Sequence, residues 1–319
     1  MASPDTVLVL TERLDPTADL VVAELARRGV AVVRFDTAEF PADLRVCATF
    51  DGRWHGVVHT RTHVLHLDAL CGAYYRRPSA FVFPPGMTEH ELGWANLEAR
   101  IGLGGVLATV PHWLNHPSRI GFAEYKPIQL AAAAAAGLDT PRTLITNDPA
   151  DARRFAAGVG QVVYKPFSAA TEKDGRRAFV YTTPVTADDI DDAVRLTAHL
   201  FQEWVPKAHE VRLTVVDDQL FAARLTAGSE AARVDWRSDY PSLVYAVDEV
   251  PAEVRLAVLR LLAELGLRFA AMDFVVTPAG RWVFLDLNPN GQWAWIEHET
   301  GLPLCAAIAD ALTRDPPPR

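Results

Sequence analysis

The sequence predicts a fold of mixed α/β and α+β type, in which an open α/β domain comes first. The first third of the chain alternates apolar strands with helices, beginning with a strand over residues 6–10, a helix over 17–28 that Gly29 ends, and a strand over 30–35. The last third instead pairs neighbouring strands across tight turns. With 319 residues, the chain can hold two or three packed units.

The remaining elements of the first domain follow from apolar runs and turn residues. Asp51 and Gly52 form the turn between two predicted strands. The predicted elements are strands over residues 44–50, 54–59 and 70–75, and a helix over 88–107 that frays at Gly102, Gly104 and Gly105. The proline-flanked stretch 111–117 marks a boundary, so we expect the first domain to span residues 1–115.

The central and C-terminal domains are expected to span residues 116–199 and 200–319. Six consecutive alanines favour a helix that Gly137 ends, and acidic first turns support two further central helices. The central elements are helices over 118–136, 148–157 and 188–196, and strands over 140–146, 161–165 and 178–182. The C-terminal elements are a strand over 200–204, hairpins over 210–225 and 269–288, and helices over 252–265 and 303–313.

Composition limits the classes of protein to consider. The formal net charge of −9 argues against a nucleic-acid binder, which would carry a basic face. The chain has no apolar run of membrane-spanning length and no signal peptide, so we expect no membrane association. Cys47, Cys71 and Cys305 are few and far apart, which suggests neither disulfides nor a zinc site and favours the cytoplasm.

The C-terminal hairpin carries the most specific chemical signal. Asp286 and Asn288 are two residues apart on one strand, so their side chains project from one face, and Asp273 lies on the partner strand. Three oxygen side chains on one sheet face suit Mg²⁺, which prefers hard oxygen ligands. The alternative is a strand whose polar face meets solvent, but the apolar neighbours Phe284 and Leu287 favour a strand inside the protein.

Two lysines stand at positions where an anion would explain them. Lys165 ends an apolar strand, where a charge is costly to bury without a partner, and Lys126 lies near the start of the alanine-rich helix. Both make sense as phosphate-binding groups next to a magnesium site. The alternative is that each lysine extends its ammonium group into solvent at the edge of the structure.

A third stretch could line a nucleoside pocket. Glu203 and Val205 lie in an apolar strand that turns through Val-Pro, and such a strand can present backbone amides to a base and an acid to ribose hydroxyls. Glu210 and Arg212 follow on the next strand, where Arg212 could neutralise a transferring phosphate. The alternative is a surface hairpin with scattered charges.

Several common motifs are absent or have the wrong context. No Walker loop, nucleophile elbow or H-E-x-x-H motif occurs, and the glycines 102, 104 and 105 end a helix instead of opening one after a strand. The histidines at 55, 59, 63 and 66 lack a fixed ligand spacing, so we interpret them as surface residues. The polar loop 168–177, which contains Gly175, could fold over a triphosphate.

Taken together, these residues resemble the ATP-grasp superfamily, whose members place an N-terminal α/β domain before two α+β domains that close on ATP. Within it, the chain resembles the graspetide (microviridin-type) peptide maturases. The supporting stretches are YYRRP at 74–78, WLNHP at 113–117, GLDTPRTLITNDP at 137–149, DWR at 235–237 and DLNPNGQW at 286–293. The last stretch is the most specific of these. The resemblance implies an ATP-grasp fold with an N-terminal pre-ATP-grasp domain.

The resemblance also implies roles for single residues. Lys126 and Lys165 would bind ATP phosphates, with Glu203, Val205 and Glu210 beside the nucleotide. The other implied residues are Asp273, Asp286 and Asn288 as Mg²⁺ ligands, Arg212 facing the transferring phosphate, and Asp235 with Arg237 orienting the acceptor. Two departures stand out: the middle metal ligand is commonly Glu but is Asp286 here, and the phosphate-covering loop is poor in glycine.

The implied reaction is cross-linking of a ribosomally made precursor peptide. ATP would phosphorylate an Asp or Glu side chain, and a Thr or Ser hydroxyl or a Lys amine would then attack, giving an ester or an amide. A leader segment of the precursor would bind to the central domain, and a homodimer is possible by analogy with the superfamily. The alternatives are a ligase for small carboxylic acids and amines, and a non-catalytic nucleotide-binding scaffold.

Overall fold

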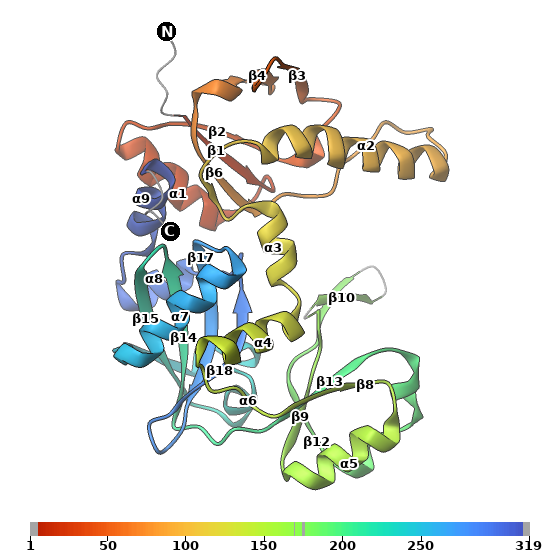
Figure 1. Cartoon of the computed structure of the whole chain (residues 1–319), viewed down its shortest axis with the longest axis vertical. Coiled ribbons are helices and arrows are strands. Elements are labelled where there is room, and N and C mark those ends of the chain that lie inside the picture. The colour runs from red at the N-terminus through yellow and green to blue at the C-terminus, as the bar shows by residue number, and fades with distance from the viewer. Residues whose placement is uncertain (1–5, 169, 174–175, 315–319) are drawn as a thin grey trace.

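A parallel four-stranded sheet in the order β2-β1-β6-β7 forms the centre of the N-terminal region (Figure 1). This computed structural model describes residues 6–168, 170–173 and 176–314. The strands are β1 (Thr6–Thr11), β2 (Ala31–Phe35), β6 (Leu70–Arg77) and β7 (Trp113–Leu114), and α1 (Pro16–Arg27) connects β1 to β2. One face packs against α2 (Glu89–Ala108) and a small antiparallel sheet of β3 (Arg45–Phe50), β4 (Trp54–His59) and β5 (Val64–His66).

Helix α2 is the longest helix in the described part of the chain. Thr88 caps its first turn, with its hydroxyl accepting from the backbone amide of Glu91. The expected fraying at Gly102, Gly104 and Gly105 is wrong, because all three lie inside the helix. Neither this helix nor any other among residues 6–168, 170–173 and 176–314 combines the length and the apolar character needed to cross a membrane.

The expected single helix over residues 118–136 is wrong, because two helices, α3 (Pro117–Ala123) and α4 (Lys126–Ala136), occupy this segment. Pro127 causes the break, since in a continuous helix its ring would clash with the carbonyl of Ala123. Proline is tolerated in a first turn, so α4 starts anew and Lys126 becomes its first residue. The Gln129 side chain then fixes α4 to the C-terminal sheet by bonding both the N–H and the C=O of Leu287.

The central region contains an antiparallel sheet in the order β12-β9-β13-β8. Its elements are β8 (Thr143–Thr146), β9 (Val162–Lys165), β12 (Thr183–Val185), β13 (His199–Glu203) and α5 (Pro149–Val159), with a separate hairpin of β10 (Ala170–Lys173) and β11 (Arg176–Phe179). The expected strand over 178–182 is therefore wrong, because β11 ends at Phe179 and residues 180–182 lie outside any strand, before β12 begins. The expected helix over 188–196 is also wrong in length, because two short 3₁₀ turns, Ala187–Asp189 and Asp192–Leu196, take its place.

A five-stranded antiparallel sheet in the order β16-β15-β14-β17-β18 forms the C-terminal region. The strands are β14 (His209–Val216), β15 (Gln219–Ala227), β16 (Leu243–Val247), β17 (Phe269–Val276) and β18 (Trp282–Asn288). The helices are α6 (Glu230–Val234), α7 (Ala252–Leu265), α8 (Ala294–Thr300) and α9 (Leu304–Thr313). Helices α4 and α7 cover one face of the sheet, and α8 and α9 pack on the other.

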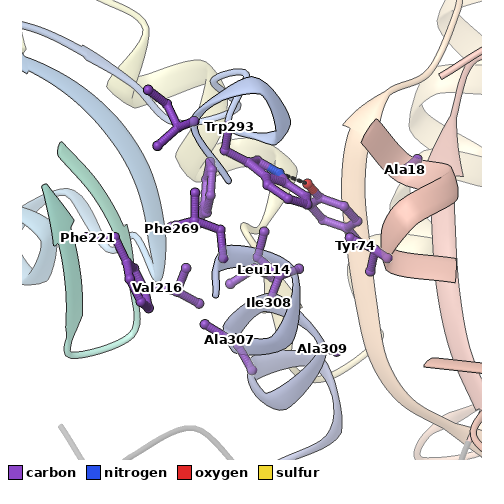
Figure 2. Close-up of a cluster of buried hydrophobic side chains, with 14 of the residues drawn as sticks. Ala18, Tyr74, Leu114, Val216, Phe221, Phe269, Trp293, Ala307, Ile308 and Ala309 are labelled. Atoms are coloured by element: carbon purple, nitrogen blue, oxygen red, sulfur yellow. Dashed lines mark hydrogen bonds between the residues drawn. The ribbon is translucent and has the colours of Figure 1, made fainter. Parts of the chain in front are cut away.

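The N-terminal and C-terminal sheets share one hydrophobic core (Figure 2). Ile308 of α9 lies between the two sheets, and Trp293 donates its indole N–H to the hydroxyl of Tyr74 at 3.3 Å. Helix α9 also packs so closely on β6 that a Cβ at Gly72 would lie 2.2 Å from the carbonyl oxygen of Leu312. The central sheet has its own core, which includes Ala152 and Phe201. The first and last thirds of the chain therefore form one packed unit.

Asn115 anchors the start of β17 and the end of β18. Its side chain is 2% exposed and makes four hydrogen bonds: it donates to the carbonyls of Phe269 and Pro289, and it accepts from the amides of Arg268 and Phe269. Buried polar groups are costly to leave without partners. This one side chain therefore satisfies four main-chain groups where three segments meet.

We expect Asn115→Ala to lower the free energy of unfolding by about 2–4 kcal/mol, because it leaves buried main-chain groups without partners. Chemical denaturation would measure the change. The matched control is Asn96→Ala, because Asn96 lies exposed on α2 and should change stability by less than about 0.5 kcal/mol. Equal effects of the two substitutions would contradict the anchoring role of Asn115.

Candidate functional site

A cavity of about 450 Å³ lies between the central sheet and the C-terminal sheet. Its lining comes from α4, β9, β13, β14, β17 and β18 and from the segment after α6. It brings together ten of the residues singled out from the sequence: Lys126, Lys165, Glu203, Val205, Glu210, Asp235, Arg237, Asp273, Asp286 and Asn288. Arg212, the remaining one, is 6% exposed and lies directly behind Asp273.

One wall of the cavity presents side-chain oxygens from paired strands. Asp273 of β17 and Asp286 of β18 are cross-strand partners, and Asn288 follows on the same face two residues later. The intervening Leu287 is buried on the opposite face, against α4 and α7. Burial of Leu287 on that face thus turns the polar side chains on either side of it toward the cavity.

These oxygens fit a magnesium ion better than a transition metal. Mg²⁺ takes hard oxygen ligands, usually only one or two carboxylates from protein, and completes its shell with phosphate and water. The wall offers two carboxylates and one amide. Across the described residues, no group of three or more His, Cys, Asp or Glu side chains could hold a metal, and this includes the histidines of β4 and β5.

Two lysines face these carboxylates from other elements. Lys126, at the start of α4, places its Nζ 2.5 Å from Oδ1 of Asp286. Burial would raise the pKa of Asp286, but Lys126 and the more distant Lys165 hold that pKa below its usual range. Lys165 ends β9, and burial lowers its pKa to about 8 although Asp286 opposes the shift. The cavity therefore holds facing charges of opposite sign.

Two arginines with carboxylate partners complete this end of the cavity. Arg212 donates to Asp273 at 2.9 Å and to the carbonyl of Gln292 at 3.2 Å. Arg237 forms a two-pronged pair with Asp235, at 2.8 and 2.6 Å. This pair outweighs the effect of burial, so the pKa of Asp235 is lowered. Both pairs keep a guanidinium fixed next to the carboxylate wall.

The other end of the cavity is formed by the last residue of β13 and the segment that follows it. Glu203 and Val205 line it, together with Trp204. Lys207 lies 5.1 Å from the centre of the Trp204 ring and pairs with Glu210 at 2.5 Å. Burial raises the pKa of Glu210 to about 7, and Lys207 opposes this rise. An aromatic ring, apolar surface and a few polar groups suit a planar heterocycle.

The sequence interpretation missed two residues of the site, and one of its predictions falls on residues that the structure does not describe. Lys207 is one of the few lysines of the chain, and that scarcity was the signal that could have identified it. No local pattern indicated that Gln292 would contact Arg212. The predicted phosphate-covering loop 168–177 includes residues that lie outside the described part of the chain, Gly175 among them.

Comparisons with known proteins agree with this geometry. The family model of the MvdD pre-ATP grasp domain matches residues 6–121. A RiPP-associated ATP-grasp ligase from Chryseobacterium gregarium, solved with ADP and a leader and core peptide, has a TM-score of 0.88 at 28% identity, over 97% of this chain and 96% of that chain. No curated protein sequence gives a significant match.

Two macrocyclases from Microcystis aeruginosa MRC are similar over nearly the whole chain. MdnC, bound with its precursor peptide MdnA, has a TM-score of 0.83 at 29% identity, over 96% of this chain and 99% of that chain. MdnB has a TM-score of 0.80 at 29% identity, over 98% of this chain and 100% of that chain. These likenesses show an ATP-grasp fold with a pre-ATP-grasp domain at residues 6–121, and they make the chain similar over nearly its full length to solved ligases that act on ribosomally made peptides.

Proposed function

We propose that this chain is an ATP-dependent ligase that cross-links side chains of a ribosomally made precursor peptide. A carboxylate oxygen of a peptide Asp or Glu attacks the γ-phosphorus of ATP, and ADP leaves. A Thr or Ser hydroxyl, or a Lys amine, then attacks the acyl carbon, and phosphate leaves as the ester or amide forms. Both steps need neutralised phosphate charge and exclusion of water from the acyl phosphate.

The observation that carries this proposal is the shared cavity. Lys126 and Lys165 meet Asp273, Asp286 and Asn288 in one space, although they come from separate parts of the chain. Cations facing oxygen ligands suit a polyphosphate with a divalent ion. The ADP complexes of the C. gregarium ligase and, with Mg, of the ligase PsnB at 25% identity support the same cofactors, ATP and Mg²⁺.

Each wall of the cavity then has a proposed task. Lys126 and Lys165 bind phosphate oxygens, while Glu203, Val205 and Glu210 contact the nucleoside end. Arg212 brings positive charge to the transferring phosphate from behind Asp273, where its guanidinium is fixed by Gln292. Arg237, held by Asp235, orients the acceptor carboxylate or its nucleophile.

Asp273, Asp286 and Asn288 are the proposed magnesium ligands. Mg²⁺ bound there would neutralise charge on the phosphate oxygens during transfer. Asp286 now pairs with Lys126. A bound triphosphate would supply a competing partner for that lysine, so the carboxylate would become free for the cation.

The partner and its setting follow from the same proposal. The precursor peptide carries a leader segment that binds the central domain and a core that enters the cavity. We keep a homodimer as the proposed assembly and the cytoplasm as the proposed compartment. The domain division at residues 115 and 199 also stays a prediction.

The decisive experiment mixes the enzyme with a candidate precursor peptide, ATP and Mg²⁺ and measures peptide mass. We expect the peptide to lose the mass of one water per bond, with one ADP formed for each bond. No mass loss together with ADP formation on a free amino acid or amine would favour a small-molecule ligase. Nucleotide binding without any turnover would favour the non-catalytic scaffold.

We expect Asn288→Ala to lower the rate of cross-linking by about 100-fold or more while the fold stays intact. The variant removes one of the oxygen ligands proposed for the Mg²⁺ ion that neutralises the transferring phosphate. Peptide mass and circular dichroism would measure the two effects. Asn147→Ala is the matched control, because Asn147 is exposed and is not among the residues that line the cavity. Wild-type activity in Asn288→Ala would refute the metal assignment.

We expect ADP binding to weaken about fivefold between pH 8 and pH 9, because Lys165, with a pKa of about 8, is charged below this range and neutral above it. Calorimetry in the presence of a chelator would measure the dissociation constant free of metal effects. Glu210, with a pKa of about 7, has lost nearly all of its protons by pH 8 and contributes little to this change.

Lys165→Arg provides the control for the pH dependence. Arginine stays charged throughout this range, so the dissociation constant of the variant should change by less than about twofold. A fivefold change that persists in Lys165→Arg would assign the titration to another group and would contradict a phosphate-binding role for the charge on Lys165.

A further inference from the structure

Arg76 is a buried charged residue that is not part of the cavity lining. It lies near the end of β6 in the N-terminal sheet and is 0% exposed. Its guanidinium crosses to the loop after β18: Nη1 donates to the carbonyl of Asn290 at 2.8 Å, and Nη2 donates to Oε1 of Gln292 at 2.5 Å. In return, the Asn290 side chain donates to the carbonyl of Arg76. A loop of the C-terminal region is thus held by one arginine of the first domain.

Neighbouring groups of the first domain reinforce this contact. Thr17, in the first turn of α1, donates its hydroxyl to the same Gln292 oxygen at 2.9 Å. Asp15 lies 3.8 Å from Nε of Arg76, but its carboxylate accepts from the hydroxyl of Thr11 and caps α1. The short hydrogen bonds of Arg76 therefore go to the loop. A buried arginine needs well-directed acceptors, so this arrangement fixes where residues 290 and 292 lie.

The same loop continues directly into the proposed catalytic residues. The amide of Asn290 donates to Oδ1 of Asn288 at 3.0 Å, and the carbonyl of Gln292 accepts from Arg212 at 3.2 Å. Between them, Gly291 is packed so tightly that a Cβ would lie 2.5 Å from Cβ of Ala271 and 2.8 Å from Nη2 of Arg212. A shift of this loop would therefore displace both the metal-site amide and the arginine behind Asp273.

We propose that Arg76 is a positioning residue, which sets the geometry of Asn288 and Arg212 through residues 290–292 without touching the substrate. This rests on the proposed function, because it assumes that Asn288 binds a metal and that Arg212 serves phosphate transfer. The proposal gives the YYRRP and DLNPNGQW stretches one shared role. Arg76 of the first stretch fixes the position of Asn290 and Gln292 in the second, and through them the side chains that line one wall of the cavity.

The principal variant is Arg76→Met, which keeps much of the side-chain volume but removes the charge and all donors. We expect kcat for peptide cross-linking to fall about 30-fold, with KM for ATP changed by less than about threefold, because the nucleotide contacts lie elsewhere. The matched control is Arg28→Met. Arg28 also joins the first and last regions, through a 2.6 Å bond to Asp310, but it has no contact with this loop. Its kcat should stay within about twofold of wild type.

A second measurement does not depend on the peptide. We expect Arg76→Met to raise the Mg²⁺ concentration needed for half-maximal enhancement of ADP binding by about fivefold, and Arg28→Met to leave it unchanged. If the wild type fails to cross-link any peptide but this shift occurs, the proposed function fails and the positioning role stands. Absence of the shift overturns the positioning role.

Gln292→Met tests the same path if Arg76→Met does not fold, since Gln292 is only half-buried. It should lower kcat about tenfold. Where both variants fold, their effects should not be additive, because each breaks one shared contact. A kcat within twofold of wild type in Gln292→Met, or additive losses in the double variant, would overturn the proposal.

Discussion

The ion pair between Lys126 and Asp286 determines how the cavity is charged. It joins the first residue of α4 to the middle of β18 at 2.5 Å, across 160 positions of sequence. Two partly buried charges are costly unless they are paired, so this contact keeps a carboxylate and an ammonium group where neither would be stable alone. Each member of the pair can also take a new partner, because a polyphosphate offers the lysine an anion and a divalent ion offers the carboxylate a cation. The same groups can thus stabilise both the free protein and its nucleotide complex.

The cavity lies between two parts of the protein that have separate hydrophobic cores. The N-terminal and C-terminal sheets share one core through α8 and α9, whereas the central sheet packs its own core around α5. Lys126, Asp286 and Asn288 belong to the shared unit, and Lys165 and Glu203 belong to the central sheet. Separate cores permit relative movement of domains.

Much of the fold and of the cavity followed from local sequence patterns. The alternation in β18 predicted that Asp286 and Asn288 share a face, and the structure pairs Asp286 with Asp273. The break before Lys126 was missed because the alanine run dominated the pattern, although Pro127 carried the signal. The bonds from Arg76 to Asn290 and Gln292 span more than 200 positions and reflect no local periodicity. Such contacts depend on how whole domains pack, which helix and strand patterns do not encode.

The position of α9 has a consequence for how the protein is made. This helix, dark blue in Figure 1, lies beside the red α1. It also packs on the C-terminal sheet and on β6 at Gly72. Val9 and Leu25 are therefore covered by residues that leave the ribosome some 280 positions later, as the separation of Arg28 from Asp310 indicates. One apolar face of the first sheet therefore stays exposed until the rest of the chain has been synthesised. During that interval, the exposed face could bind chaperones or aggregate with other chains.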